Sequence, residues 1–199
     1  MRDQDITYIN EARSDYAGFV FAPSRRQVSP AQAERLRQKL DPGIIPVGVF
    51  VNAPIAEIAA LHRSGIIDIA QLHGTEDEEY IVQLKDECGV PVIKVIFTTN
   101  HTNTHEQNEI ISSCRSWLYY SSNSDYYLFD SGAGSGKTFD WDLLGTQNID
   151  KPWFLAGGIN LDNIEKAMAF NPFAVDISSG AETEGVKNRE KILELCMRR

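Results

Sequence analysis

Two aspartates stand where a carboxyl group can exchange a proton with a bound molecule. Asp130 directly follows the apolar run 126–129 (YYLF), a setting that suits a carboxyl group acting as a general acid. Asp176 lies inside another apolar run, 174–177, where it either faces a binding cleft or joins a buried polar network. The structural alternative for Asp130 is a cap for the turn that follows its strand.

Two short glycine- and serine-containing segments have the residues needed to bind a phosphate through backbone N–H groups. Gly157 and Gly158 follow the apolar run 153–156, and Ser178, Ser179 and Gly180 follow the run 174–177. Small residues allow the backbone to approach an anion closely, so the sequence predicts a phosphate site from these loops. The alternative is that the glycines only serve tight turns.

Arg26 and His73 are candidate substrate-binding residues on two other loops. Arg26 lies in PSRRQVS (23–29), and its planar guanidinium can hold a carboxylate through two parallel hydrogen bonds. His73 lies in QLHG (71–74), at the end of the expected strand 69–72, and can orient a substrate or bond to a neighbouring side chain. A solvated surface arginine is the alternative for Arg26.

The tract SGAGSGKT (131–138) resembles the end of a nucleotide-binding Walker motif but fails in register. The motif requires glycine at position 131, which is Ser131, and FDW follows the tract instead of a long helix. We interpret the tract as a lid that closes over the substrate, with Gly136 as a substrate-binding residue. A plain surface loop is the alternative.

No metal site is predicted. His101 and His105 have a spacing compatible with metal binding on a helix, but they lie in a polar segment without a third ligand. Cys88, Cys114 and Cys196 are odd in number and lack CxxC spacing, so neither a disulfide framework nor a zinc site is indicated.

Apolar runs typical of buried strands alternate with helical segments, which predicts a parallel α/β architecture. The expected strands are 17–21, 46–51, 69–72, 92–96, 126–129, 153–156 and 174–177. The expected helices are 2–11, 30–39, 54–64, 76–88, 108–113, 161–170 and 187–197. Segment 131–144 is expected to form a loop with at most a short helix. Since an open doubly wound sheet would carry a glycine-rich turn after its first strand, we predict a TIM-type (β/α)8 barrel with only seven of its eight strands in this chain.

Length and charge restrict the class of protein. With 199 residues, 42% of them hydrophobic, the chain is expected to form one domain over residues 1–199. A net charge of −9 argues against general affinity for nucleic acid or anionic membranes, which require a basic surface. No apolar stretch approaches the roughly 20 residues of a membrane span, and no signal peptide is visible. We expect a cytoplasmic monomer or homodimer that binds a small phosphorylated molecule.

Six segments together resemble the phosphoribosylanthranilate isomerase family of tryptophan biosynthesis, along nearly the whole chain. They are DYAGFVFAPSRRQVS (15–29), PVGVFVN (46–52), IAQLHG (69–74), LFDSGAGSGKTFDW (128–141), FLAGGINLDNI (154–164) and PFAVDISSGAE (172–182). The resemblance implies an Amadori rearrangement of N-(5-phosphoribosyl)anthranilate without metal or organic cofactor. It implies that Asp130 is the general acid, that Arg26 binds the anthranilate carboxylate, that His73 lines its pocket, and that the two glycine loops hold the phosphate.

The general base of that family is a cysteine in a Lys-x-Cys-Gly motif at the end of the first strand. These 199 residues contain no such motif, and the three cysteines fall in helical or connecting segments. We therefore expect an N-terminally truncated barrel with weak or no isomerase activity. Another sugar-phosphate barrel enzyme is an alternative, against which QLHG and FDSGAGSGKTFDW argue. A non-catalytic barrel that binds a phosphorylated ligand is the alternative from a different class.

Overall fold

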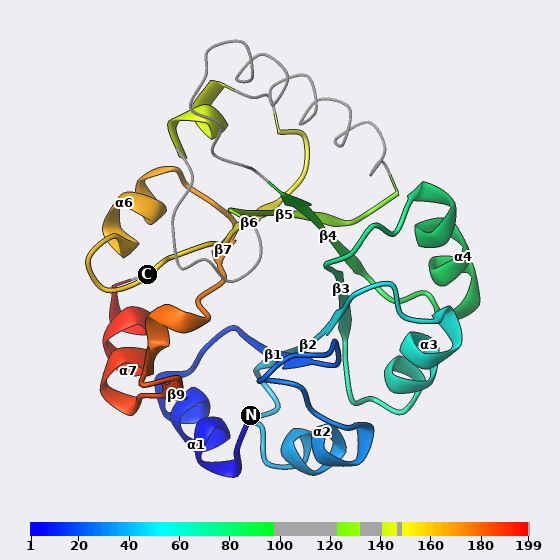
Figure 1. Ribbon diagram of the computed structural model, residues 1–199, viewed down its shortest axis with the longest axis horizontal. Coiled ribbons are helices and arrows are strands. Elements are labelled where there is room, and N and C mark those ends of the chain that lie inside the picture. Colours follow the sequence, from blue (N-terminus) through cyan, green and yellow to red (C-terminus); the bar gives the residue numbers. More distant parts are fainter. Residues whose placement is uncertain (98–122, 132–140, 147–148, 199) are drawn as a thin grey trace. The chain divides into compact units, whose positions relative to one another are not determined.

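The computed structural model describes residues 1–97, 123–131, 141–146 and 149–198 (Figure 1). Contacts within the chain divide it into two compact units, Met1–Lys94 and Val95–Arg199, called here the first and the second unit. The candidate site residues are distributed over both units.

Seven strands form a sheet in which chain order is also spatial order, from β1 to β7. They are β1 (Tyr16–Val20), β2 (Ile45–Phe50), β3 (Ile69–Leu72), β4 (Val92–Phe97), β5 (Tyr126–Asp130), β6 (Trp153–Leu155) and β7 (Ala174–Val175). β1 to β4 pair parallel in turn in the first unit, and β5 to β7 do so in the second. This order confirms the predicted α/β fold of TIM type, since strands that pair parallel in chain order build that fold.

Four helices belong to the first unit: α1 (Asp3–Ala12), α2 (Pro30–Arg37), α3 (Ile55–Arg63) and α4 (Glu78–Cys88). Figure 1 shows α2, α3 and α4 on the same side of β1 to β3. The predicted start of α2 is confirmed, because the Ser29 side chain accepts a hydrogen bond from the Gln32 N–H at 3.2 Å and Pro30 occupies the first turn. The chain opens on a helix, as expected, and β1 follows it.

The hydrophobic core of the first unit lies between this helical layer and one face of the strands. Leu36, Ile58 and Leu84 from the helices pack in one cluster with Leu72 and Val92 from the strands, and all five are fully buried. Since side chains alternate between the two faces of a strand, the odd-numbered residues of β3 project from the opposite face. This alternation decides which side chains reach the candidate site.

The second unit contains α6 (Ile164–Ala169), α7 (Arg189–Met197) and two 3-10 helices, η1 (Trp141–Thr146) and η2 (Ser179–Ala181). η1 agrees with the short helix allowed for segment 131–144. A two-stranded antiparallel hairpin, β8 (Glu182–Thr183) and β9 (Val186–Lys187), was not predicted. The helix expected from residue 187 begins at Arg189, because Lys187 belongs to the hairpin and the Asn188 side chain caps α7. The helix expected at 108–113 lies outside the described residues.

Candidate active site

Asp130 is the last residue of β5 and is half-buried, as its place after an apolar strand predicts. The backbone ladder continues to this point, since the Ala156 N–H donates to the Phe129 carbonyl at 2.8 Å. That bond places Gly157 beside Asp130. A Cβ built on Gly157 would lie 3.0 Å from Asp130 Oδ1 and 2.8 Å from the Ser131 nitrogen, so only glycine fits without displacement. The first phosphate-loop candidate therefore directly contacts the predicted acid.

The loop after β6 has a backbone conformation that favours glycine. Gly157 and Gly158 have φ angles of 87° and 68°. The Gly158 carbonyl accepts hydrogen bonds from Asn160 Nδ2 at 3.2 Å and Asn163 Nδ2 at 3.0 Å. Because the peptide is planar and trans, the N–H of Ile159 points away from these two amides. Asn160 and Asn163 thus mainly fix this loop. Asn163 precedes α6, but its side chain does not cap the helix.

The loop after β7 packs against the loop after β6. A Cβ on Gly180 would overlap the Ile159 carbonyl oxygen and would lie 2.9 Å from Asn160 Cα. Ser178 and Ser179 are exposed at the start of η2, and the Ser178 carbonyl accepts a hydrogen bond from Lys187 Nζ at 2.7 Å. The structure therefore brings together the two segments that the sequence predicts to bind phosphate, with an ammonium group beside one of them.

The position of Asp176 requires a small correction. It was expected within the strand 174–177, but β7 ends at Val175 and Asp176 directly follows it. Its N–H still donates to the Leu155 carbonyl at 2.8 Å, so the residue remains at the edge of the sheet. The strand ends early because the chain turns into η2 after only two paired residues. Asp176 is half-buried.

Arg26 lies in a short closed loop after β1. The Val28 N–H donates to the Val20 carbonyl at 2.8 Å, and Gln27 Nε2 donates to the Phe21 carbonyl at 2.9 Å. These bonds draw the two ends of the loop together and leave Arg26 near its tip, half-buried. Backbone and Gln27 side-chain bonds therefore help to fix the geometry of this loop.

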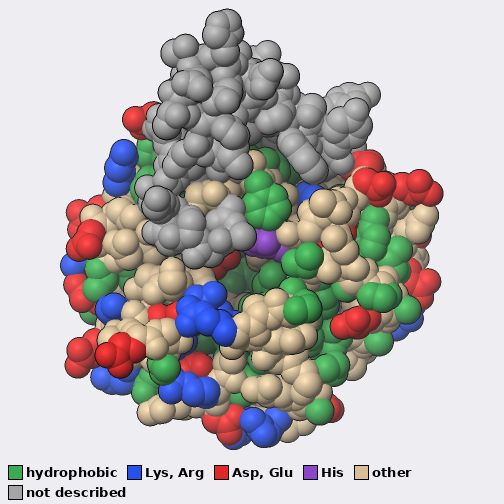
Figure 2. Space-filling model, viewed as in Figure 1, with side chains coloured by type: hydrophobic (Ala, Val, Ile, Leu, Met, Phe, Trp, Pro, Cys, Tyr) green, Lys and Arg blue, Asp and Glu red, His purple; other side chains and the backbone are tan. Residues whose placement is uncertain are grey.

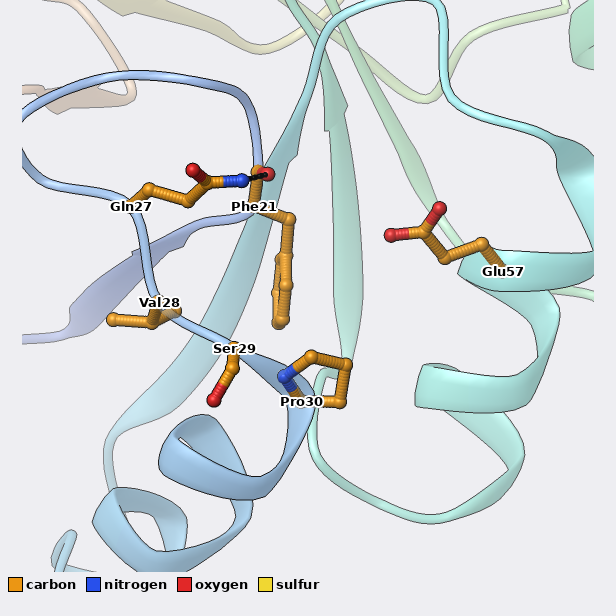
Figure 3. Close-up of a pocket in the computed structure, with 6 residues that line it drawn as sticks. All are labelled: Phe21, Gln27, Val28, Ser29, Pro30 and Glu57. Atoms are coloured by element: carbon orange, nitrogen blue, oxygen red, sulfur yellow. Dashed lines mark hydrogen bonds between the residues drawn. The ribbon is translucent and has the colours of Figure 1, made fainter.

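Beside this loop lies a pocket of about 420 Å³, lined by Phe21, Gln27, Val28, Ser29, Pro30 and Glu57. Figure 3 shows the Phe21 ring extending toward Pro30, with the Glu57 side chain across the pocket on α3. None of the candidate site residues lines it. The Glu57 carboxylate makes the pocket a poor match for an anionic ligand, because like charges repel.

His73 follows β3, and its N–H donates to the Phe50 carbonyl at 2.8 Å. The imidazole Nδ1 lies 3.2 Å from Gln71 Nε2. With the Gln71 amide as the donor, Nδ1 is the acceptor and the ring proton is on Nε2. His73 and Gln71 are two positions apart, so both side chains project from the face of the strand opposite to Leu72.

The sequence analysis missed a buried ion pair next to His73. Lys94 Nζ, in β4, lies 2.9 Å from Glu76 Oε2, and both side chains are 1% exposed. Burial lowers the pKa of Lys94, while the hydrogen bond and charge of Glu76 oppose that shift. The signal that could have revealed the pair is the single lysine in the otherwise apolar strand VIKVIF (92–97), because an isolated charge is not stable in such a place.

Several expectations fall on residues that the structure does not describe. Gly136 and the lid segment 132–140 lie outside the described residues, as do His101, His105 and Cys114. Within the described ranges no group of three or more metal-binding side chains is found. In the same ranges, no helix is long and apolar enough to cross a membrane. On the described part of the face in Figure 2, acidic and basic side chains are interspersed.

Comparison with protein families and curated sequences gives one consistent result. The family described as N-(5'phosphoribosyl)anthranilate (PRA) isomerase matches residues 1–198. The enzyme of that name from Endomicrobium trichonymphae is 43% identical over 199 residues, which cover 97% of this chain and 91% of the relative. The Clostridium acetobutylicum enzyme is 42% identical over 200 residues, covering 99% and 93%.

Solved structures agree with the sequences. Phosphoribosyl anthranilate isomerase from Thermotoga maritima is 30% identical, with a TM-score of 0.83, and the match covers 100% of this chain and 94% of that one. A second structure, 29% identical with a TM-score of 0.80 and coverage of 99% and 93%, contains reduced 1-(o-carboxyphenylamino)-1-deoxyribulose 5-phosphate. A thiamine phosphate pyrophosphorylase from Pyrococcus furiosus, 13% identical with a TM-score of 0.64, shares only the fold.

Proposed function

The chain belongs to the N-(5'-phosphoribosyl)anthranilate isomerase family and is an isomerase of tryptophan biosynthesis, and from this premise we propose how its residues divide the reaction. The substrate is N-(5'-phosphoribosyl)anthranilate, and the product is 1-(2-carboxyphenylamino)-1-deoxyribulose 5-phosphate. The observation that best supports this division is the contact between the predicted acid, Asp130, and the loop of Gly157.

In the proposed mechanism Asp130 gives its proton to the furanose ring oxygen. The bond from that oxygen to C1 breaks, and the nitrogen lone pair forms the C1=N double bond of a Schiff base. A base then removes the proton from C2, and the resulting enol tautomerises to the ketone. Substrate and product are isomers, so the reaction has no net need of an oxidant or a reductant. Asp130 suits the first step, because it ends its strand at the edge of the sheet where TIM-type barrels place catalytic groups.

The phosphate is proposed to bind at Gly157, Gly158 and at Ser178, Ser179 and Gly180. Support comes from the close packing of the two loops and from the positive φ angles of the first one. The Lys187 ammonium group lies next to the Ser178 carbonyl, and its charge is partly balanced by the Glu182 carboxylate at 3.7 Å. Backbone N–H groups of such loops bind anions well. Fixing the phosphate next to Gly157 would bring the sugar to Asp130.

Arg26 and His73 are proposed to bind the anthranilate end of the substrate. Arg26 would form two hydrogen bonds with the carboxylate, and His73 would offer Nε2–H to the ligand. Asp176 and Gly136 are proposed as further substrate-binding residues. These roles rest on the resemblance of the surrounding motifs and remain predictions.

The general base is proposed to be a cysteine in a Lys-x-Cys-Gly segment that these 199 residues do not contain. Two of the three cysteines present, Cys88 and Cys196, lie on α4 and α7, and the Cys88 thiol donates to the Leu84 carbonyl. The chain of 199 residues is therefore expected to turn over substrate weakly or not at all. We further propose that the protein is cytoplasmic, that it forms a single domain over residues 1–199, and that it has no affinity for nucleic acid. Its assembly is proposed to be a monomer or a homodimer; one related structure is of monomers of a dimeric enzyme from Thermotoga maritima.

The test is isomerase activity, followed by the loss of substrate fluorescence. The chain of 199 residues is measured beside an extended chain, which adds a strand ending in Lys-x-Cys-Gly before Met1. Turnover by the extended chain alone supports both the assigned reaction and the missing base. Equal turnover by both chains contradicts the proposed base. If both fold and neither turns over, the protein is a binder of phosphorylated ligands and the assigned mechanism is wrong.

A further inference from the structure

The buried ion pair of Lys94 and Glu76 holds the backbone on both sides of the residue that follows His73. Lys94 Nζ donates to the Gly74 carbonyl at 2.9 Å, and Glu76 Oε2 accepts from the Gly74 N–H at 3.0 Å. Both peptide groups of Gly74 are therefore bound by the two members of one ion pair, whose own separation is 2.9 Å.

The same carboxylate also connects this loop to the end of β2. Glu76 Oε1 accepts from the Asn52 N–H at 2.6 Å, and Asn52 Oδ1 accepts from the Thr75 N–H at 2.9 Å. Gly74 has no room for a side chain, because a Cβ would lie 2.6 Å from Asn52 Oδ1. Residues on or just after three consecutive strands, β2, β3 and β4, thus contribute to fixing the two peptide groups that flank Gly74.

The side chains of the ion pair and the His73 imidazole lie on opposite faces of the sheet. Lys94 and Val92 are two positions apart on β4, so their side chains project from the same face, and Val92 packs in the helix-side core. Lys94 is also paired across the sheet with Leu72, which belongs to that core. His73 projects from the other face, where it meets Gln71. Both side chains of the pair are 1% exposed, and their hydrogen bonds to the Gly74 carbonyl and N–H connect them to the backbone next to His73.

We propose that the Lys94–Glu76 ion pair is a positioning device, which fixes the backbone on both sides of Gly74 and thereby sets the orientation of the His73 imidazole, the group proposed to contact the substrate. The identity of the ligand group at which His73 points rests on the proposed function. A buried pair built only for stability would not need to bind the peptide groups on both sides of one residue, since apolar residues of similar volume stabilise a core at least as well.

The test separates positioning from stability with two variants of the 199-residue chain. The double variant Lys94→Met/Glu76→Leu replaces the pair by apolar side chains of similar size, a type of change that folded proteins tolerate. The control, Asp5→Asn, alters another buried carboxylate of the first unit, which is 3% exposed and accepts from the Arg2 N–H at 2.7 Å and Arg2 Nη2 at 2.6 Å. Thermal unfolding of each variant measures its stability.

Two readouts are taken: the Kd for reduced 1-(o-carboxyphenylamino)-1-deoxyribulose 5-phosphate, and the imidazole nitrogen resonances of His73, assigned with His73→Gln. The double variant is expected to bind about tenfold more weakly, the effect of one poorly placed hydrogen bond, and to show both ring tautomers in place of one. The control is expected to retain the affinity and the resonances of the unaltered chain.

The outcomes distinguish this inference from the proposed function. If the unaltered chain binds the ligand and the double variant binds equally well with unchanged His73 resonances, the pair is only structural and the inference is wrong. If the unaltered chain does not bind the ligand, the proposed substrate is wrong, and the His73 resonances alone decide the inference. If the double variant does not fold, Glu76→Gln, which preserves shape and one acceptor oxygen, is measured in the same way.

Discussion

The Cα of Gly157 and the carboxylate of Asp130 are so close that any side chain at position 157 would push against the predicted acid. A Cβ there would lie 3.0 Å from Asp130 Oδ1, a distance tighter than ordinary van der Waals contact. The loop that is proposed to hold the phosphate and the group proposed to give the proton therefore cannot move independently.

Gly157→Ala is expected to displace Asp130 and to reduce the kcat of the extended chain by about 100-fold, the cost of a misplacement of roughly 1 Å. Gly65→Ala is the matched control, because Gly65 also has a positive φ, 72°, but has no atom within 4 Å of a Cβ. Both variants lose the backbone freedom of glycine, but only in Gly157→Ala does the new methyl group press against the Asp130 carboxylate. Steady-state kinetics measure kcat for both variants. Equal kcat values would rule out the contact with Asp130 as the cause of the lower rate.

Asp130→Asn is expected to lower kcat of the extended chain by a factor of about 100 to 10,000, the usual contribution of a general acid. The change is nearly isosteric, so the Kd for the reduced product analogue should remain within about threefold, because the amide of Asn keeps the size of the carboxyl group and can still donate and accept hydrogen bonds. Calorimetric titration gives the affinity and single-turnover kinetics give the rate. A variant with an unchanged rate would show that another group protonates the ring oxygen.

Gly180→Ala is expected to separate the loops after β6 and β7, because the new methyl group overlaps the Ile159 carbonyl oxygen. Loss of one or two hydrogen bonds to the phosphate predicts a KM about 10- to 100-fold higher. The control is Gly18→Ala in β1, where the only neighbour of a Cβ is Val49 Cγ2 at 4.0 Å. The prediction fails if both variants show the KM of the unaltered enzyme.

Tyr80 should titrate later than an ordinary tyrosine. Burial, followed by the charges of Glu76 and Glu57, raises the pKa of Tyr80 from 10.0 to about 12, and its hydroxyl donates to the Ala53 carbonyl at 2.7 Å. Because the folded-state pKa is the higher one, the stabilising effect is complete below pH 10 and is lost as the pH rises through about 12. Titration of tyrosinate absorbance for the chain and for Tyr80→Phe measures the difference. A difference spectrum that titrates near pH 10 would contradict the pKa shift.

The parts of the fold that could be predicted from sequence are those with strong local signals. The apolar run 69–72 has the same first and last residues as β3, and α2 begins at Pro30 with Ser29 as its N-cap. The hairpin of β8 and β9 was missed because two-residue strands leave no periodic pattern; its turn has positive φ at Glu184, 51°, and Gly185, 78°.

Sequence reasoning correctly put Asp130 at the end of a strand and the glycine loops after β6 and β7, because strand ends are visible in the sequence, while the site roles of these residues stay predictions. It could not show that Gly180 packs on Ile159, or that Lys94 pairs with Glu76, because these contacts join residues that are distant in the chain. The lone lysine of β4 was a signal for a buried partner, but nothing in the sequence identified which carboxylate it would be.

The packing of Gly180 on Ile159 also limits how this protein can be redesigned. Neither loop can be lengthened or exchanged alone, because the backbone of one is the surface against which the other is shaped. Transplanting a phosphate loop from another barrel would therefore require both loops to be transferred as one unit. For the same reason, an insertion in either loop is expected to be tolerated only with a compensating change in the other.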